Sequence, residues 1–176
     1  MKLVLDFDDV VFNAAGLKAR FFEVLEKEGI EKPEEQYTYE RQNNRYFSML
    51  GFIERICREK GWSNAGTLYE TIMKACEDLL DPQMVELMQK VGVMNCYLVT
   101  YGDKQFQEAK MVRSGAYKYV VGHAVTQGNK KKEVEEICEK FKNETVFFVD
   151  DKDHYFTALD TVKYPNLKTF KYHKVL

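Results

Sequence analysis

The feature that most constrains the fold is an apolar run at the start of the chain that ends in acidic residues. Residues 3–5 (Leu-Val-Leu) are followed within four positions by the carboxylates of Asp6, Asp8 and Asp9. An apolar run of this length is typical of a central strand in a parallel sheet that is covered on both faces. Because ligands of such sheets bind beyond the carboxyl ends of the strands, we expect Asp6 and Asp8 to lie at a binding site.

Asp6 and Asp8 are two residues apart, so their side chains point the same way from an extended chain. They would repel each other unless a cation lies between them or one of them holds a proton. Mg²⁺ suits such a pair, because it prefers oxygen ligands and usually combines a few carboxylates with substrate phosphate. Acidic pairs also occur in solvated turns, so Asp6 and Asp8 alone do not distinguish a metal site from a turn. Other residues of the chain are needed to distinguish them.

The length and composition indicate one domain, or one domain with a small insert. The chain has 176 residues, of which 45% are hydrophobic and 31% charged, so it can bury a core and stay soluble. Its formal net charge is −2 and its basic residues are scattered, which argues against a nucleic-acid or membrane-surface partner. No apolar run approaches the roughly 20 residues that cross a bilayer. Acidic residues interrupt the N-terminus and the four cysteines lie far apart, so we expect a cytoplasmic protein with reduced thiols.

Residues 13–92 have the pattern of consecutive helices without a strand. Apolar residues recur there at helical spacing, and glycine and proline mark the helix ends. Within this stretch, residues 37–46 bring aromatic and arginine side chains together. They form either a partly exposed helix surface or a surface that faces a substrate, since aromatic rings and arginine can grip a ligand. Arg41 and Arg45 are the candidates for substrate binding.

From residue 95 onward, strands alternate with helices. The predicted strands are residues 96–99, 119–125, 145–149 and 167–172. Phe106, Ala109 and Val112 mark the helix that follows the first of these strands. The alternation predicts an α/β, Rossmann-like parallel sheet with helices on both faces and right-handed crossovers. Residues 13–92 separate the first strand from the others, so they form an all-helical insert.

Polar groups stand at the ends of three of these strands and should meet at one edge of the sheet. They are Asp6 and Asp8, Thr100, and Asp150 with Asp151. Taken singly, each has a structural explanation: Thr100 can bond to a turn backbone, and an aspartate pair can be a solvated strand end. The lysine run 130–132 can likewise be a solvated helix start. Their combination in this order is much more specific.

These motifs resemble those of the haloacid dehalogenase-like (HAD) superfamily of phosphatases and phosphotransferases. Residues 3–10 (LVLDFDDV) resemble its first motif, an apolar strand followed by D-x-D. Residues 98–103 (LVTYGD) resemble the second, an apolar strand that ends in threonine or serine. Lys130 is similar to the third-motif lysine, and residues 147–151 (FFVDD) resemble the D-D form of the fourth motif.

The resemblance covers residues 1–12 and about 93–172, but not the helical stretch, which stands where family members carry a small helical cap. It implies a core domain of residues 1–12 and 93–176 and a cap domain of residues 13–92. One departure is that family members have a further aspartate after the fourth motif. Tyr155 and Phe156 stand four and five residues after Asp151, and Asp153 lies nearby.

The resemblance implies a Mg²⁺-dependent phosphatase that hydrolyses a small-molecule phosphomonoester through an aspartyl-phosphate intermediate. Asp6 would be the nucleophile, and Asp8 the general acid and then the general base. Thr100 would hydrogen-bond a phosphoryl oxygen, and Lys130 would pair with the phosphate and with Asp6. The implied metal ligands are Asp6, Asp8 (through its backbone carbonyl), Asp150 and Asp151. The implied substrate-binding residues are Thr100, Tyr101, Gly102 and Lys130, to which the helical stretch adds Arg41 and Arg45.

Only one of the three consecutive lysines can face the strand ends, because a helix spreads neighbouring residues about 100° apart. Lys130 lies one turn before Val134, on the expected buried face of the following helix. Lys131 is the alternative, and Lys132 falls on the opposite side. We therefore expect Lys130 to serve the phosphate.

Other functions are compatible with parts of this pattern. A phosphotransferase or sugar-phosphate mutase would need a cap that excludes water. A receiver-like switch would need an aspartate at the end of a middle strand where this chain is helical, and a non-catalytic phosphate-binding module would not need all four motifs. Dehalogenation is disfavoured, because breaking a carbon–halogen bond needs no second aspartate as proton donor.

Overall fold

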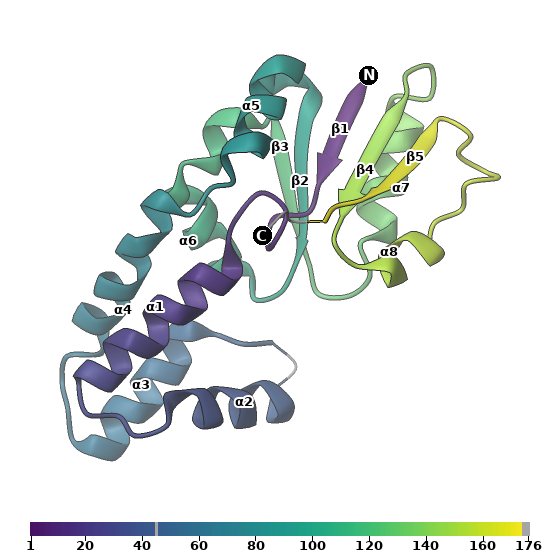
Figure 1. Cartoon of the computed structure of the whole chain (residues 1–176). Helices are drawn as coiled ribbons and strands as arrows, with labels where there is room; N and C mark the ends of the chain where they lie inside the picture. Colours follow the sequence, from purple (N-terminus) through teal and green to yellow (C-terminus); the bar gives the residue numbers. More distant parts are fainter. Residues whose placement is uncertain (45, 174–176) are drawn as a thin grey trace.

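The computed structural model of the protein describes residues 1–44 and 46–173 (Figure 1). In this part of the chain, five parallel strands form one sheet with the order β3-β2-β1-β4-β5. The strands are β1 (Lys2–Leu5), β2 (Cys96–Tyr101), β3 (Gly122–Thr126), β4 (Val146–Asp150) and β5 (Leu167–Lys171). The parallel sheet and its helices confirm the predicted fold class.

Helices fill the chain between β1 and β2 and then alternate with strands. Those between β1 and β2 are α1 (Ala14–Lys27), α2 (Pro33–Asn43), α3 (Met49–Lys60), α4 (Ala65–Lys74) and α5 (Pro82–Val91), with the 3₁₀ helices η1 (Ala75–Asp78) and η2 (Val93–Asn95). The later ones are α6 (Lys104–Ser114), η3 (Ala116–Tyr119), α7 (Lys131–Lys140) and α8 (Asp153–Thr157). None of the described helices has the length and apolar character that crossing a membrane requires. We call α1–α4 with η1 the helical block.

Two element boundaries differ by three residues or more from those predicted. The strand expected at 119–125 begins only at Gly122, because residues 116–119 form η3 instead. Apolar residues at helical spacing, from Tyr155 to Val162, predict a last helix that runs to about residue 162, but α8 ends at Thr157. A turn follows it, in which the carboxylate of Asp160 accepts a hydrogen bond from the Lys163 N–H at 2.9 Å. Asp favours such local turns over helix continuation, which explains the early end.

β1 lies at the centre of the sheet and is buried on both faces. Leu3 and Leu5 belong to the larger hydrophobic cluster, together with residues of the helical block and of α6. Val4 points to the other face, where it packs in a second cluster with Val134 and Cys138 of α7. Because successive side chains of a strand alternate between faces, this apolar run has to be covered on both sides, as its sequence predicts.

The helical block leaves the sheet and returns to it at one place. An antiparallel bridge pairs Phe12 with Leu80. The Asn13 N–H donates to Leu79 O and the Asp81 N–H donates to Val11 O, both at 2.8 Å. Figure 1 shows the block extending from this crossing beyond the carboxyl end of the sheet. The division of the chain into a core domain and a cap domain stays a prediction.

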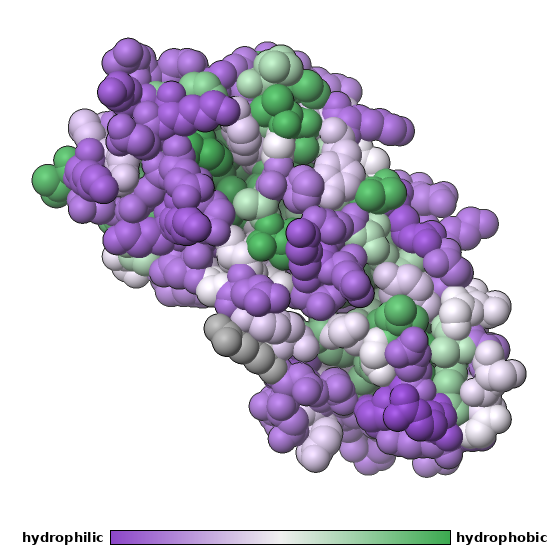
Figure 2. All heavy atoms as spheres, turned by 180° about the vertical axis from the view of Figure 1, so that it is seen from behind, coloured by the Kyte–Doolittle hydropathy of each residue, from purple (hydrophilic) through white to green (hydrophobic). Residues whose placement is uncertain are grey.

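The surface on the side opposite to that of Figure 1 is mostly hydrophilic (Figure 2). Hydrophobic residues appear on it as small separate areas rather than as one large patch. Isolated exposed hydrophobic residues are usual on soluble proteins and indicate no particular partner.

Candidate active site

Three carboxylates lie together at the carboxyl ends of the neighbouring strands β1 and β4. Asp6, Asp150 and Asp151 each offer one carboxylate oxygen, and these oxygens all lie within 4.8 Å of one another. Asp6 is 2% exposed and Asp150 is fully buried. Parallel pairing of β1 with β4 places Leu5 beside Val149, so the residues that follow them necessarily meet. The sheet topology therefore gathers acidic residues that are far apart in the sequence.

Lys130 is the buried cation of this group. Its Nζ lies 2.7 Å from Asp6 Oδ1 and 2.7 Å from Asp150 Oδ2, and 4.2 Å from the centre of the Tyr155 ring. Lys130 immediately precedes α7 and is 2% exposed. Tyr155 stands where the resemblance leads one to expect an aspartate. In this chain its ring contacts the ammonium of Lys130 instead. The placement of Lys130 agrees with the expectation from helix geometry, and its catalytic role stays a prediction.

The two following lysines point elsewhere. Lys131 pairs with Glu135 at 3.6 Å, one turn along α7, and Lys132 has Glu136 at 3.9 Å. The Lys132 side chain is 79% exposed. Both pairs lie on the outer surface of the helix and take no part in the carboxylate group.

The carboxylate group carries more negative than positive charge. The pKa of Asp6 is raised to about 7, because burial and the Asp150 carboxylate raise it more than the Lys130 ammonium lowers it. Burial and Asp150 also raise the pKa of Asp151 above its usual value, and Lys152 acts in the opposite direction. A single buried ammonium therefore does not compensate the three carboxylates.

The residues present fit a divalent cation. Asp151 Oδ1 is buried and accepts no hydrogen bond from any described residue, although Lys152 Nζ lies 3.8 Å away. A buried oxygen that accepts no hydrogen bond needs another partner. Together with the neighbouring carboxylates it provides the oxygen ligands that Mg²⁺ prefers. Asp153 does not join the group, because its carboxylate pairs with Lys171.

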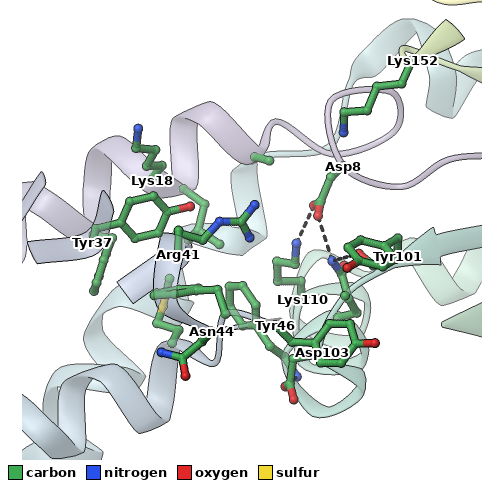
Figure 3. A pocket seen from close by; sticks show the side chains of 18 residues that line it. Asp8, Lys18, Tyr37, Arg41, Asn44, Tyr46, Tyr101, Asp103, Lys110 and Lys152 are labelled. Carbon is green, nitrogen blue, oxygen red and sulfur yellow. Dashed lines mark hydrogen bonds and ion pairs between the residues drawn. The ribbon is translucent and has the colours of Figure 1, made fainter. Parts of the chain in front are cut away.

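Asp8 contributes no side-chain oxygen to this group, although it was among the predicted metal ligands. Its carboxylate points into a neighbouring pocket, where Lys110 Nζ forms an ion pair with Oδ1 and Gln107 Nε2 donates to Oδ2 at 2.8 Å (Figure 3). Burial raises the pKa of Asp8, but the Lys110 ammonium and the hydrogen bonds outweigh burial, so that the pKa lies below its usual value. The predicted metal contact of the Asp8 backbone carbonyl stays a prediction.

Lys110 is almost completely buried, which is unusual for a lysine. It is 2% exposed, and its Nζ lies 5.5, 5.4 and 4.8 Å from the ring centres of Phe7, Phe12 and Phe106. The aromatic faces attract the ammonium and fix its position, while Asp8 neutralises it. These contacts hold the Lys110 ammonium beside the Asp8 carboxylate.

Lys110 and Gln107 were not predicted from the sequence, because the apolar residues of α6 defined its expected buried face. Val112 is in fact 63% exposed. The buried residues of α6 are Gln107, Lys110, Met111 and Ser114. Their i, i+3, i+4, i+7 spacing defines one helix face. This spacing is visible in the sequence, although most of the residues that carry it are polar.

The second predicted motif lies at the end of β2, beside the same pocket. Thr100 is 1% exposed and lies beside Val125 of β3 in the sheet. Gly102 has φ +147°, and a Cβ there would lie 2.9 Å from Gln107 Nε2. Glycine is therefore needed for Gln107 to reach both Asp8 and the Tyr101 carbonyl, to which it donates at 3.1 Å.

A pocket of about 250 Å³ lies between the helical block and the carboxyl end of the sheet (Figure 3). Asp8, Gln107 and Lys110 line one part of it, with Tyr101 and Gly102. Residues of α1 and α2 line another part. Arg41, predicted to bind substrate, is among these, whereas Arg45 lies outside the described residues.

Comparison with known proteins reveals similarity in structure only. No protein-family model matches the sequence, and no curated protein matches it. A haloacid dehalogenase-like hydrolase from Burkholderia xenovorans LB400, so described, superposes with a TM-score of 0.72 at 18% identity, over 95% of this chain and 81% of that one. The HAD-hydrolase YfnB from Bacillus subtilis, bound to magnesium, superposes with a TM-score of 0.53 at 14% identity, over 96% and 84% of the two chains.

A dehalogenase in an intermediate complex is also similar, with a TM-score of 0.55 at 12% identity over 97% of this chain and 83% of that one. The structures agree over nearly the whole chain, including the helical block. The protein therefore has the fold of the haloacid dehalogenase-like hydrolases, as the motifs of its sequence indicate.

Proposed function

We propose that this chain belongs to the HAD superfamily and is a Mg²⁺-dependent phosphatase, which hydrolyses a small-molecule phosphomonoester. The observation that carries the proposal is the contact of Lys130 with both Asp6 and Asp150, beside the Asp151 oxygen that accepts no hydrogen bond from a described residue. This arrangement combines a nucleophile, a cation for a phosphoryl oxygen and a carboxylate set for a metal. Asp8 lies two residues from the nucleophile and faces the pocket.

Asp6, Asp150 and Asp151 would hold Mg²⁺, which would reduce the repulsion between the Asp6 carboxylate and the phosphate dianion. Lys130 would act on the same repulsion from the protein side, because its ammonium already contacts the Asp6 oxygen. Lys130 also keeps the Asp6 carboxylate in place, as does the Phe7 N–H, which donates to Oδ1 at 2.7 Å. The Thr100 hydroxyl would donate to a phosphoryl oxygen.

The chemistry requires two proton transfers, which we assign to Asp8. In the first half, an Asp6 oxygen bonds to phosphorus, the ester P–O bond breaks, and the leaving oxygen takes a proton from Asp8. In the second half, Asp8 removes a proton from water as the water oxygen bonds to phosphorus. The Asp6–phosphorus bond then breaks, which releases inorganic phosphate and restores the Asp6 carboxylate.

Lys110 affects the two halves differently. It stabilises ionised Asp8, which is the form that accepts the proton of water. In the first half Asp8 has to carry a proton, and the nearby ammonium opposes this. We therefore expect esters with acidic leaving groups to react faster than alkyl esters.

A dehalogenase is the main competing function, since one similar structure is a dehalogenase. Halide needs no proton when it leaves, so that reaction has no use for Asp8 as a general acid. Two further alternatives are a phosphotransferase or sugar-phosphate mutase, and a non-catalytic phosphate-binding module. Neither is favoured by a specific contact in the described residues.

The test is phosphate release from a panel of phosphorylated metabolites and aryl phosphates, with Mg²⁺, with Ca²⁺ and with EDTA. We expect turnover with Mg²⁺ and its loss with EDTA, and Ca²⁺ should inhibit because it prefers more ligands in looser geometry. Asp6→Asn should abolish turnover. Halide release from haloacids, full activity in EDTA or unchanged activity of Asp6→Asn would contradict the proposal. Transfer of phosphate to an added sugar phosphate in preference to water would favour a transferase.

A further inference from the structure

The charges around the pocket point to a property of the substrate, on the basis of the proposed function. We infer that the substrate carries a second anionic group, a carboxylate or a second phosphate, which binds Arg41 while the first phosphate lies at Asp6. The inference rests on which cations of the pocket already have a partner.

Among the described residues, four cationic side chains line the pocket, and three of them face a carboxylate. Lys110 pairs with Asp8, Lys18 lies 3.3 Å from Glu34, and Lys152 lies 3.8 Å from Asp151. Arg41 has no carboxylate within 4.0 Å in the part of the chain that the structure describes, and its guanidinium makes no hydrogen bond there.

The remaining acidic residue of the lining, Asp103, is used differently. It caps α6 by accepting a hydrogen bond from the Phe106 N–H at 2.8 Å. Three of the four cations are thus already paired with a neighbouring carboxylate. Arg41 is the lining cation that an anionic ligand can engage without breaking an existing pair.

The position of Arg41 separates it from the reaction. It lies in the last turn of α2, in the helical block, whereas Asp8 lies in the turn after β1 and Lys110 lies on α6. In Figure 3 its guanidinium points into the space between Tyr37 and Lys110. A substrate that reaches from the Asp6 carboxylate to Arg41 therefore has its second anion at the end opposite to the reacting phosphate.

Four aromatic side chains line the pocket together with Arg41. They are Tyr37, Phe47, Tyr101 and Phe106. Where rings displace water from a bound ligand, the local dielectric constant falls and charges attract more strongly than they do in bulk water. A guanidinium also binds carboxylate or phosphate through two parallel hydrogen bonds, which a lysine cannot do. The volume of about 250 Å³ limits the ligand to a small molecule.

The test measures binding rather than turnover. Phosphonocarboxylic acids of increasing chain length are compared with their carboxamides, which have the same shape but lack the second charge. Binding to the Mg²⁺-loaded protein is measured by isothermal titration calorimetry. For at least one chain length, the acid should bind about tenfold more tightly than the amide, as a charge-assisted hydrogen-bonded pair provides. Arg41→Gln should abolish this preference, and Arg41→Lys should retain part of it.

Arg58→Gln is the matched control. Arg58 lies in the last turn of α3, is exposed, does not line the pocket and, like Arg41, has no carboxylate within 4.0 Å among the described residues. This variant should keep the full preference for the acid. The inference is overturned if no acid binds more tightly than its amide, or if the preference survives in Arg41→Gln. Because phosphonates are not hydrolysed, failure here would leave the phosphatase proposal to its own assay, and failure of phosphate release would not alter the binding result.

Discussion

Lys110 and Asp8 form an ion pair although 102 residues separate them in the sequence. The Lys110 side chain is 3% exposed and that of Asp8 is 23% exposed, so the cation is buried and the anion reaches the pocket. The pair connects α6 with the turn that follows β1. The Lys110 ammonium also lowers the pKa of Asp8 and so favours its ionised form. Two predictions depend on this pair.

The first prediction concerns stability. Lys110→Met should destabilise the protein by up to about 3 kcal/mol, because it leaves the Asp8 carboxylate in a partly buried position without its cation. Lys110→Met combined with Asp8→Asn should cost clearly less than the sum of the two single changes, since the double variant leaves no unpaired charge. Urea denaturation gives the free energies of unfolding of the four proteins. Additive effects would show that the pair is not energetically coupled.

The second prediction concerns leaving groups. The pKa of Asp8 is lowered in the folded protein, so its acid form is lost as pH rises through that lowered value. Lys110→Met removes the ammonium, and burial then raises the pKa, so more Asp8 carries a proton at neutral pH. The ratio of kcat/KM for an alkyl phosphate to that for an aryl phosphate should rise in this variant. Lys104→Met is the control, because Lys104 lies exposed on the same helix, and its ratio should stay at the wild-type value.

The third prediction assigns the phosphate lysine. Lys130→Ala should lower kcat/KM by at least about two orders of magnitude, or roughly 2.7 kcal/mol of transition-state stabilisation. Lys131→Ala and Lys132→Ala should stay close to wild type, because these lysines pair with Glu135 and Glu136 on the surface of α7. A large loss in Lys131→Ala alone would assign the phosphate-binding role to Lys131. No loss in any of the three variants would show that none of these lysines binds the phosphate.

The fourth prediction uses the raised pKa of Asp6, which is about 7 in the folded protein against 3.8 for an ordinary aspartate. A carboxyl whose pKa rises on folding binds protons more tightly when folded. Its contribution to stability is therefore complete below about pH 4 and is lost as pH rises toward 7. In EDTA, the free energy of unfolding of Asp6→Asn relative to wild type should increase between these values. An unchanged difference across this range would show that Asp6 titrates normally.

The residues at the strand ends could be predicted because the fold itself brings them together. In a parallel sheet, the residue after each strand lies at the same edge, so Asp6, Thr100 and Asp150 follow from the order of strands and helices. Lys130 followed from helix periodicity, because only one of three consecutive lysines can face inward. These predictions needed no knowledge of side-chain packing.

Lys110 could not be predicted in this way. Its partner is not a neighbour in the sequence or in a strand pair, and a lysine on a helix is normally read as exposed. Apolar periodicity selected Val112 as a buried residue, yet α6 buries Gln107 and Lys110 because Asp8 needs donors there. A polar contact of this kind contradicts the hydrophobic pattern locally, and such contradictions are expected at functional sites.

The crossing of the chain between sheet and helical block has a consequence for how such proteins diversify. Residues 13 and 79 are joined by one backbone hydrogen bond, and residues 11 and 81 by another. Because the two ends of this insert lie together, a change in its length alters the entropy of loop closure little, by about 0.6 kcal/mol for each doubling. The helical block is thus a replaceable module: a different insert that preserves these two hydrogen bonds would present a new pocket wall to the same carboxylates.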